Sequence, residues 1–315
     1  MKTKALHFFL TVIAAIAVQD ALKAQTAAFL TITPDPVAMS MGGTGAVLEA
    51  TPFTMWNNTA ASALDERKFQ AAASYSLWQP SYSANNIASV AGYGRVAEFM
   101  TVSAGVRYFS HRPYDVTDGT TGTVTGTFSP VDIQAGIGLG FRILPILSLG
   151  ANINYVYSHI GGPQAGNAVS ADFGALLDLR FIKVGLTASN IGSRLNYGGA
   201  SSYALPANIS LGVGTEQYFG ADDRHALAVN LQGGTLLESP AFFAGVGAQY
   251  CYNGLVRVSA GYHYGEPDKS VIGQYVSVGA GVKVLGISID AAYLIGTSAD
   301  SPIGNSFSVG IGYAF

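Results

Sequence analysis

Side chains capable of acid–base or metal chemistry are few and scattered in this sequence. The five histidines are His7, His111, His159, His225 and His263, and no two stand at metal-ligand spacing. Asp222 and Asp223 precede His225, but the run Gly220–Arg224 is more typical of a charged turn than of a metal or acid–base site. No nucleophile elbow or other serine-hydrolase motif is present. The sequence predicts no catalytic residue, no metal site and no cofactor, and therefore a protein that is not an enzyme.

The run Met41-Gly42-Gly43-Thr44-Gly45 is similar in composition to the glycine-rich loops that hold phosphate groups. It lacks the lysine and the following serine or threonine of such a loop, and no strand-to-helix context surrounds it. We interpret its glycines as positions that allow tight turns of the backbone.

Single charged residues recur at positions that a two-residue repeat places on one side of a strand. They are Arg107, Asp132, Arg142, Asp172, Asp178, Arg257 and Asp290. One interpretation is that they form ion pairs between the wall of a barrel and a segment inside it, and the other is that they line a solute path. The near balance of sign favours ion pairs, because selective pores usually carry rings of one sign.

The elements that would position these residues are strands with a period of two. From Phe307 to Phe315 every odd position is large and apolar, and the even positions hold only serine, glycine and alanine. The segments Val131–Arg142 and Leu147–Tyr157 repeat this pattern. About ten such residues cross a bilayer when the strand is tilted. A chain that ends on an aromatic residue after such a strand is typical of bacterial outer-membrane barrels.

Fourteen candidate strands follow from this alternation and from breaks at Gly, Asn, Asp and Pro. They begin near Phe69, Asn85, Met100, Val131, Leu147, Val169, Ile182, Ile209, His225, Phe243, Leu255, Tyr275, Ile287 and Ser306. The even number suits a closed antiparallel barrel. The sequence therefore predicts an all-β fold, a transmembrane antiparallel β-barrel of about 14 strands over residues 68–315.

The composition favours a membrane protein as well. Only 11% of the residues are charged, whereas soluble domains carry about 25%. The mean hydropathy is +0.31, which a barrel reaches without any helical span because each strand is half apolar. The formal net charge of −3, with no basic cluster, argues against nucleic acid as a partner. Cys251 is the single cysteine, so no disulfide can form within the chain.

Residues 1–24 have the features of a secretory signal peptide. Lys2 and Lys4 precede the apolar run Ala5–Val18, and Leu22–Ala24 is a plausible cleavage site. The alternative, an N-terminal membrane anchor, would need a longer apolar run.

Residues 25–67 precede the first strand and are rich in Gly, Pro, Ala and Thr. Inward-facing glycines would leave a gap along the axis of a barrel of roughly fourteen strands. We therefore expect residues 25–67 to form a plug or hatch in the lumen. A disordered periplasmic arm is the alternative, but Met39, Val47 and Trp56 make the segment too apolar for it.

Two parts of this segment resemble the opening of the FadL superfamily. They are residues 38–47, Ala-Met-Ser-Met-Gly-Gly-Thr-Gly-Ala-Val, and residues 55–60, Met-Trp-Asn-Asn-Thr-Ala. The closest likeness is to the PorV/PorQ group of Bacteroidota outer-membrane proteins. Further matches in the same order are Phe128–Pro130, Leu205-Pro206, Gly247–Tyr250 and Arg257–Tyr262. The sequence departs from the family at Asn58, which replaces a proline, and at Thr59, which is an extra residue.

The resemblance assigns the plug motif to Met41, Gly42, Gly43, Gly45, Trp56 and Asn57. It also implies a fourteen-stranded barrel with an N-terminal plug and a role beside the type IX secretion apparatus. PorV-like members cap the translocon and accept the exported signal domain, whereas PorQ-like members sit in the attachment complex. The short chain with modest loops is more similar to the PorQ-like subtype or to an uncharacterised paralogue.

Two functions are therefore expected for an integral protein in the outer membrane of a Gram-negative bacterium of the Bacteroidota. The first is a non-enzymatic subunit of a protein secretion or surface-attachment complex, whose partners are outer-membrane lipid and other envelope proteins. The alternative is a FadL-like transporter of hydrophobic small molecules, with such a molecule as its ligand. An apolar pocket for it would have to come from the plug.

If the protein docks another protein, two loops are the expected contact sites. Residues 111–130 contain Tyr114 and a Thr/Gly repeat that predicts an extended ribbon or a surface loop. Residues 194–206 contain Leu195, Tyr197 and Tyr203. Aromatic residues are enriched in protein interfaces, and loops often carry binding function. Ordinary variable loops are the alternative interpretation.

Overall fold

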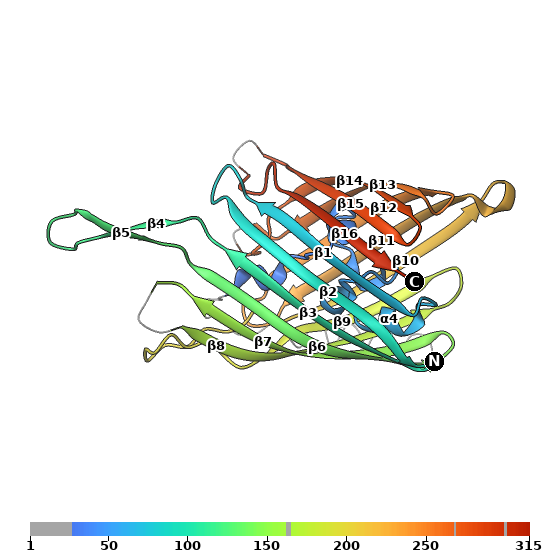
Figure 1. Ribbon diagram of the computed structural model, residues 1–315, viewed down its shortest axis with the longest axis horizontal. Helices are drawn as coiled ribbons and strands as arrows, with labels where there is room; N and C mark the ends of the chain where they lie inside the picture. Colours follow the sequence, from blue (N-terminus) through green and yellow to red (C-terminus); the bar gives the residue numbers. More distant parts are fainter. Residues whose placement is uncertain (1–26, 162–164, 268, 299–300) are drawn as a thin grey trace.

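The computed structural model describes residues 27–161, 165–267, 269–298 and 301–315. Within them, fourteen strands form a closed antiparallel barrel in which β1 pairs with β16 (Figure 1). The barrel strands are β1 (Phe69–Trp78), β2 (Asn85–Ala97), β3 (Met100–Ser110), β6 (Val131–Leu144), β7 (Leu147–His159), β8 (Gly166–Asp178), β9 (Lys183–Gly192), β10 (Asn208–Phe219), β11 (His225–Leu236), β12 (Phe242–Tyr252), β13 (Val256–Gly265), β14 (Tyr275–Val284), β15 (Ile287–Gly296) and β16 (Phe307–Ala314). The predicted fold class is confirmed. The predicted signal peptide lies outside the described residues.

The alternation of side chains explains why this sequence closes into a barrel. In β7, Leu149 and Ile153 on the outer face are 45% and 63% exposed, while Asn152 and Asn154 on the inner face are 2% and 0% exposed. An apolar outer face meets lipid without unpaired polar groups, and closure of the sheet leaves no free strand edge. The chain is therefore a transmembrane barrel of the outer-membrane type.

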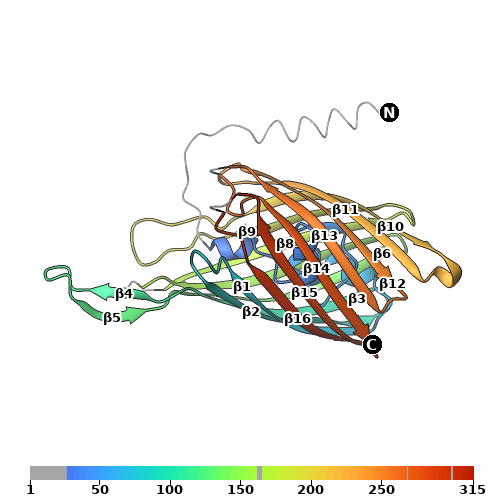
Figure 2. The same ribbon diagram turned by 90° about the horizontal axis from the view of Figure 1, so that it is seen from above.

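The strand starts agree closely with the sequence pattern, with β8 as the largest difference. It begins at Gly166 rather than near Val169, because Gly166 already pairs with Ser158 of β7. The run Gly166–Ala168 has no large apolar residue, so alternation could not reveal it. Two further strands, β4 (Tyr114–Thr117) and β5 (Val124–Phe128), form a separate ribbon that projects beyond the barrel (Figure 2).

Residues 27–67, hereafter the luminal segment, lie within the barrel (Figures 1 and 2). The segment contains η1 (Ala28–Thr31), α2 (Pro36–Ser40), η2 (Gly45–Val47), α3 (Thr54–Asn57) and α4 (Ala60–Leu64). It contacts three sectors of the wall in turn: α2 contacts β13 to β16, η2 contacts β9 to β11, and α4 contacts β6 to β8. These contacts bury most of the segment. No helix among the described residues has the length and apolar character needed to cross a membrane.

The two ends of the barrel differ in the length of their connections. At one end, the turn end, two-residue connections join β2 to β3, β6 to β7 and β14 to β15. At the other, the loop end, residues 111–130 and 193–207 form long connections. Short turns face the periplasm in outer-membrane barrels and longer loops face outward, which orients this chain. Phe315 lies at the turn end (Figure 1).

Candidate functional site

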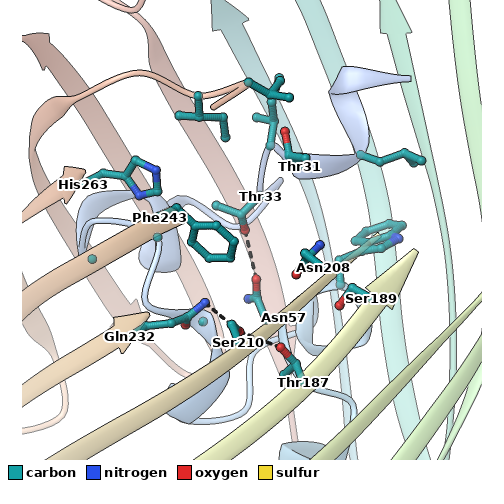
Figure 3. A pocket seen from close by; sticks show the side chains of 18 of the residues that line it. Thr31, Thr33, Asn57, Thr187, Ser189, Asn208, Ser210, Gln232, Phe243 and His263 are labelled. Atoms are coloured by element: carbon teal, nitrogen blue, oxygen red, sulfur yellow. Dashed lines mark hydrogen bonds between the residues drawn. The ribbon is translucent and has the colours of Figure 1, made fainter. Parts of the chain in front are cut away.

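A cavity lies in the middle of the lumen, between the luminal segment and the wall. Its volume is about 140 Å³, close to the roughly 150 Å³ of an engineered protein cavity that binds benzene. Figure 3 shows Thr187, Ser210 and Gln232 on one side of it and Thr33 and Asn57 on the other. The lining also includes Leu30, Ile32, Met39, Trp56, Trp78, Arg107, Gln134, Phe243, His263, Ile272 and Tyr275. The central cavity is therefore mixed in character, with aromatic and aliphatic surfaces beside hydroxyl and amide groups.

Hydrogen bonds hold the polar part of the cavity wall. The Ser210 hydroxyl lies 2.7 Å from the Thr187 hydroxyl and accepts a hydrogen bond from Gln232 Nε2 at 3.2 Å. Gln232 Oε1 in turn accepts from the Ala46 backbone N–H at 2.9 Å. On the opposite side, Thr33 Oγ1 donates to Asn57 Oδ1 at 3.0 Å. Hydrogen bonds thus join the wall to the luminal segment on one side of the cavity and hold the luminal segment to itself on the other.

The glycine motif lets the luminal segment approach the wall closely. Gly42 has a φ of 67°, and a Cβ atom there would lie 2.5 Å from the carbonyl oxygen of Tyr262 and 2.7 Å from that of Val246. A side chain would therefore push the segment off the wall and strain the backbone. Gly42, Gly43 and Gly45 line the cavity, while Met41 is fully buried beside them.

Asp35 organises the luminal segment, and the sequence interpretation missed it. Its carboxylate accepts from the Val37 backbone N–H at 3.0 Å, Thr51 Oγ1 at 2.6 Å and Asn57 Nδ2 at 2.9 Å. Burial raises the pKa of the Asp35 carboxyl, against the hydrogen bonds from Thr51 and Val37, which lower it. An acidic residue directly before Pro36 is a helix N-cap signal, which could have revealed this role.

The two residues that depart from the FadL pattern anchor the segment to the wall. Asn58 Nδ2 donates to the carbonyl oxygens of Ala46 at 2.8 Å and Ala175 at 3.2 Å. Thr59 Oγ1 donates to Asn152 Oδ1 at 2.7 Å. A proline side chain at position 58 could not donate the two hydrogen bonds of Asn58. Asn58 and Thr59 thus attach the luminal segment to β8 and β7.

Arg107 joins the wall to the luminal segment through backbone carbonyls. Its side chain is 3% exposed, and it donates to the carbonyl oxygens of Phe29 and Leu30, each at 3.2 Å, and of Ile32 at 2.9 Å. Its Nε donates to Gln134 Oε1 at 2.6 Å. The guanidinium carbon lies 5.1 Å from the Phe29 ring centroid and 5.6 Å from that of Trp56. Such cation–π contacts favour a desolvated cation.

The other charged residues predicted to face the lumen do face it, but most pair within the wall. Arg257 Nε lies 2.6 Å from Asp290 Oδ1, and Lys183 Nζ lies 3.9 Å from Asp178 Oδ2. Asp132 Oδ2 lies 3.0 Å from Nε2 of His111, just beyond β3. Among the described residues, no ion pair joins any of the seven predicted side chains to the luminal segment. Within the described residues, these seven side chains therefore do not form the ion pairs between wall and plug that the sequence favours.

The physical reason is that the luminal segment presents mainly backbone carbonyls to the wall. Arg142 Nε accordingly donates to the Ala63 carbonyl at 3.0 Å, and Arg107 likewise donates to three backbone carbonyls of the luminal segment. Asp172 accepts from Asn154 Nδ2 at 2.7 Å and from the Asn190 backbone N–H at 2.7 Å. Asn190 has a φ of 59°, and the β8–β9 register shifts between Ala171 and Phe173. Asp172 therefore accepts the hydrogen bond of the Asn190 backbone N–H where the pairing of β8 and β9 is irregular.

An apolar cluster fills the loop end of the lumen. The luminal segment contributes Ala27, Phe29, Leu30, Ile32 and Met39, the strands contribute Trp78, Ile87, Phe109, Val156, Ala168, Tyr275, Ala292 and Leu294, and the loops contribute Leu195, Leu205 and Ile303. Phe29 packs against Phe109 with ring centroids 5.8 Å apart. Leu30, Ile32, Met39, Trp78 and Tyr275 of this cluster also line the central cavity.

The loop residues considered as partner contacts are not all accessible. Tyr114 is 54% exposed on the β4–β5 ribbon. Leu195 is completely buried, because its backbone pairs with Tyr203 and its side chain belongs to the apolar cluster. Tyr197 packs against the same cluster and donates to Ser158 Oγ at 2.8 Å. Leu195 is therefore corrected from a surface contact to a core residue.

The candidate acid–base residues outside the lumen are dispersed. Asp222 and Asp223 lie exposed in the short turn η3 (Ala221–Asp223), and His225 Nδ1 lies 2.6 Å from the Tyr250 hydroxyl. Among the residues that the structure describes, no group of three or more His, Cys, Asp or Glu side chains could hold a metal ion.

A fourteen-stranded transmembrane barrel with a folded segment in its lumen defines the class of this protein. Several solved structures match it over most of the chain. The toluene transporter TbuX of Ralstonia pickettii matches with 13% identity over 89% of this chain and 97% of its own, at a TM-score of 0.62. The toluene transporter TodX of Pseudomonas putida matches with 12% identity over 88% and 96%, at a TM-score of 0.63. A FadL homologue of Pseudomonas aeruginosa matches with 14% identity over 90% and 99%, at a TM-score of 0.54.

These similarities establish the fold: the chain has the FadL-type barrel architecture. No family model and no curated protein sequence matches the chain.

Proposed function

We propose that this protein is an outer-membrane channel for small hydrophobic molecules. The observation that carries the proposal is the central cavity, which has the size of a single-ring molecule and lies between a folded luminal segment and a FadL-type wall. The transporters TbuX and TodX share that wall architecture and are named for toluene. An outer membrane with a polar outer surface slows hydrophobic solutes, and a cavity inside the barrel would give such a solute a binding site on a path across it.

The secretion-complex role implied by the PorV/PorQ likeness is the weaker candidate. Residues 38–47 and 55–60 support it, together with the exposed β4–β5 ribbon as a contact surface. The matching structures named above are not secretion subunits by their names, and Leu195 is buried. Extraction from native membranes of a Bacteroidota host in mild detergent, followed by mass spectrometry, distinguishes the two. Stoichiometric recovery of secretion subunits would favour the complex, and recovery of the barrel alone would favour the channel.

Uptake of radiolabelled toluene tests the channel directly. The assay uses intact cells of a Gram-negative host with a complete lipopolysaccharide layer, with and without the protein. Ser189 lines the cavity, so Ser189→Trp should fill it and reduce uptake at least several-fold, while Ser189→Ala should leave uptake unchanged. Slower electrophoretic migration after heating verifies that each barrel folds. Equal uptake in cells with and without the protein would contradict the proposal.

A further inference from the structure

The central cavity contains hydrogen-bond donors that have no acceptor in the protein. Among the described residues that line it, two buried side-chain atoms lack a partner, Gln134 Nε2 and Trp56 Nε1. Gln134 is completely buried. A buried polar group without a partner costs about 1–3 kcal/mol, so sites of this kind are retained where something else satisfies them. Both atoms are N–H donors, so both call for an acceptor.

The orientation of the Gln134 amide is fixed by its neighbour. Arg107 Nε donates to Gln134 Oε1 at 2.6 Å, and a guanidinium can only donate hydrogen bonds. Rotation of the amide by 180° would bring two N–H groups face to face. The amide nitrogen must therefore remain on the side away from Arg107.

Both donors lie around the same guanidinium. Trp56 stacks 5.6 Å from the Arg107 guanidinium carbon, and Gln134 is hydrogen-bonded to that group. Arg107 also donates hydrogen bonds to the backbone carbonyls of residues 29, 30 and 32. The Asp172 carboxylate lines the same cavity and interacts electrostatically with Arg107, while its oxygens accept from Asn154 Nδ2 and the Asn190 backbone N–H. The two unpaired N–H donors, rather than the net charge of the cavity, therefore favour an oxygen acceptor on a ligand.

The rest of the lining fits a flat apolar ring. Trp78, Phe243 and Tyr275 line the cavity together with Trp56. Aromatic side chains contact a planar ligand with their faces or edges, and each contact adds to the free energy of burial. The volume of about 140 Å³ admits one six-membered ring with a short substituent.

We propose that the central cavity binds a single-ring organic molecule that carries an oxygen acceptor, such as an aryl carbonyl compound, in preference to a plain hydrocarbon. The ligand oxygen accepts a hydrogen bond from Gln134 Nε2, and Trp56 Nε1 is the second donor. This inference rests on the proposed channel function and narrows the class of its substrate.

Binding of an isosteric pair to the detergent-solubilised full-length protein tests this specificity. Toluene and benzaldehyde have nearly the same shape, but only benzaldehyde has an acceptor. Isothermal titration calorimetry should give a dissociation constant at least tenfold lower for benzaldehyde. Equal or tighter binding of toluene, or no binding of either compound, would overturn the inference.

Matched variants locate the donors. Trp56→Phe keeps the ring beside Arg107 and removes the N–H, and Gln134→Glu keeps an acceptor for Arg107 Nε and removes the amide donor. Each should reduce the preference for benzaldehyde at least threefold with little effect on toluene. Trp78→Phe, the same change at another position in the cavity, should leave the preference intact. An unchanged preference in both Trp56→Phe and Gln134→Glu would overturn the assignment.

The toluene uptake assay separates this inference from the channel proposal. Uptake that depends on the protein, together with no preference for benzaldehyde in the binding assay, would overturn the inference and leave the channel standing. Absence of protein-dependent uptake of both toluene and benzaldehyde would contradict the channel proposal.

Discussion

At the loop end of the lumen, the luminal segment is held by buried apolar side chains and by the buried Arg107, whereas at the turn end it is held by partly solvated ion pairs and amide hydrogen bonds. Phe29, Leu30 and Ile32 are each less than 7% exposed within the apolar cluster. At the turn end, Arg67 donates to Asp65 Oδ1 at 2.8 Å and to Glu49 Oε1 at 2.8 Å.

The turn-end contacts continue into the first strands. Gln70 Nε2 donates to the Ala50 carbonyl at 3.0 Å and to Asp65 Oδ2 at 2.9 Å, and the Tyr93 hydroxyl also donates to Asp65. Apolar contact excludes water without requiring one fixed geometry, whereas these directional bonds define where the chain leaves the lumen and enters β1. The contacts at the loop end thus mainly exclude water from the lumen, and those at the turn end mainly fix the position of the backbone before β1.

Truncation of Phe29 should have the largest effect on this difference. Phe29→Ala removes the contacts with Phe109 and Arg107, and loss of a buried phenylalanine costs about 3–5 kcal/mol. Hydrogen exchange of residues 28–32, measured by mass spectrometry in micelles, should accelerate by two orders of magnitude or more. Exchange of residues 49–51 should change little. Unchanged protection of residues 28–32 would show that burial does not hold the loop end.

Asn58→Pro should release the middle of the segment at a cost of about 3 kcal/mol or more. Asn58 has a φ of −156°, which proline cannot adopt, and its backbone N–H donates to the Thr54 carbonyl at 2.9 Å. Peptides that cover α3 and α4 should lose protection from hydrogen exchange. Asn58→Ala, which keeps the backbone N–H, should show a smaller loss. Wild-type protection in Asn58→Pro would contradict this prediction, because it would show that the backbone accommodates proline at position 58.

Removal of the Arg257 charge should destabilise the turn end of the wall by about 1–3 kcal/mol, toward the lower value because the pair is partly solvated. Arg257→Met leaves the Asp290 carboxylate without the partner that now lies 2.6 Å away. The midpoint of thermal unfolding in detergent should fall. The double variant Arg257→Met/Asp290→Leu should recover most of the loss, because it buries no unpaired charge. Failure to recover would point to packing by the arginine stem instead.

A higher salt concentration should have the smallest effect on the difference in stability between the two ends, below about 1 kcal/mol. Raising NaCl from 0.1 M to 1 M shortens the Debye length from about 10 Å to 3 Å and screens exposed ion pairs. The Arg67–Glu49 pair qualifies, because its side chains are 23% and 63% exposed. Exchange of residues 49–51 should accelerate slightly, and that of residues 28–32 should not. The Arg107 contacts at the loop end are buried and should be screened little. Equal acceleration at both ends would contradict the assignment of exposed ion pairs to the turn end.

Much of the architecture could be read from the sequence alone. Because successive side chains of a strand point to opposite faces, Val309, Ile311 and Tyr313 report a lipid-facing surface without knowledge of any neighbour. The same local rule placed Arg107 and Asp290 on the inner face, since a charge facing lipid would be costly. The number of strands and nearly all of their starts followed from this rule.

Only the tertiary structure decided what those inward side chains meet. Arg107 contacts carbonyls more than seventy residues earlier in the chain, and backbone carbonyls leave no trace in a sequence pattern. The sequence predicts Leu195 as a contact for a partner, but the residue is buried by apolar side chains from both the wall and the luminal segment. The central cavity likewise exists because residues 27–67 fold against strands far away in sequence. Side-chain direction is a local property of the strand and so is encoded locally, whereas contacts across a lumen depend on closure of the whole barrel.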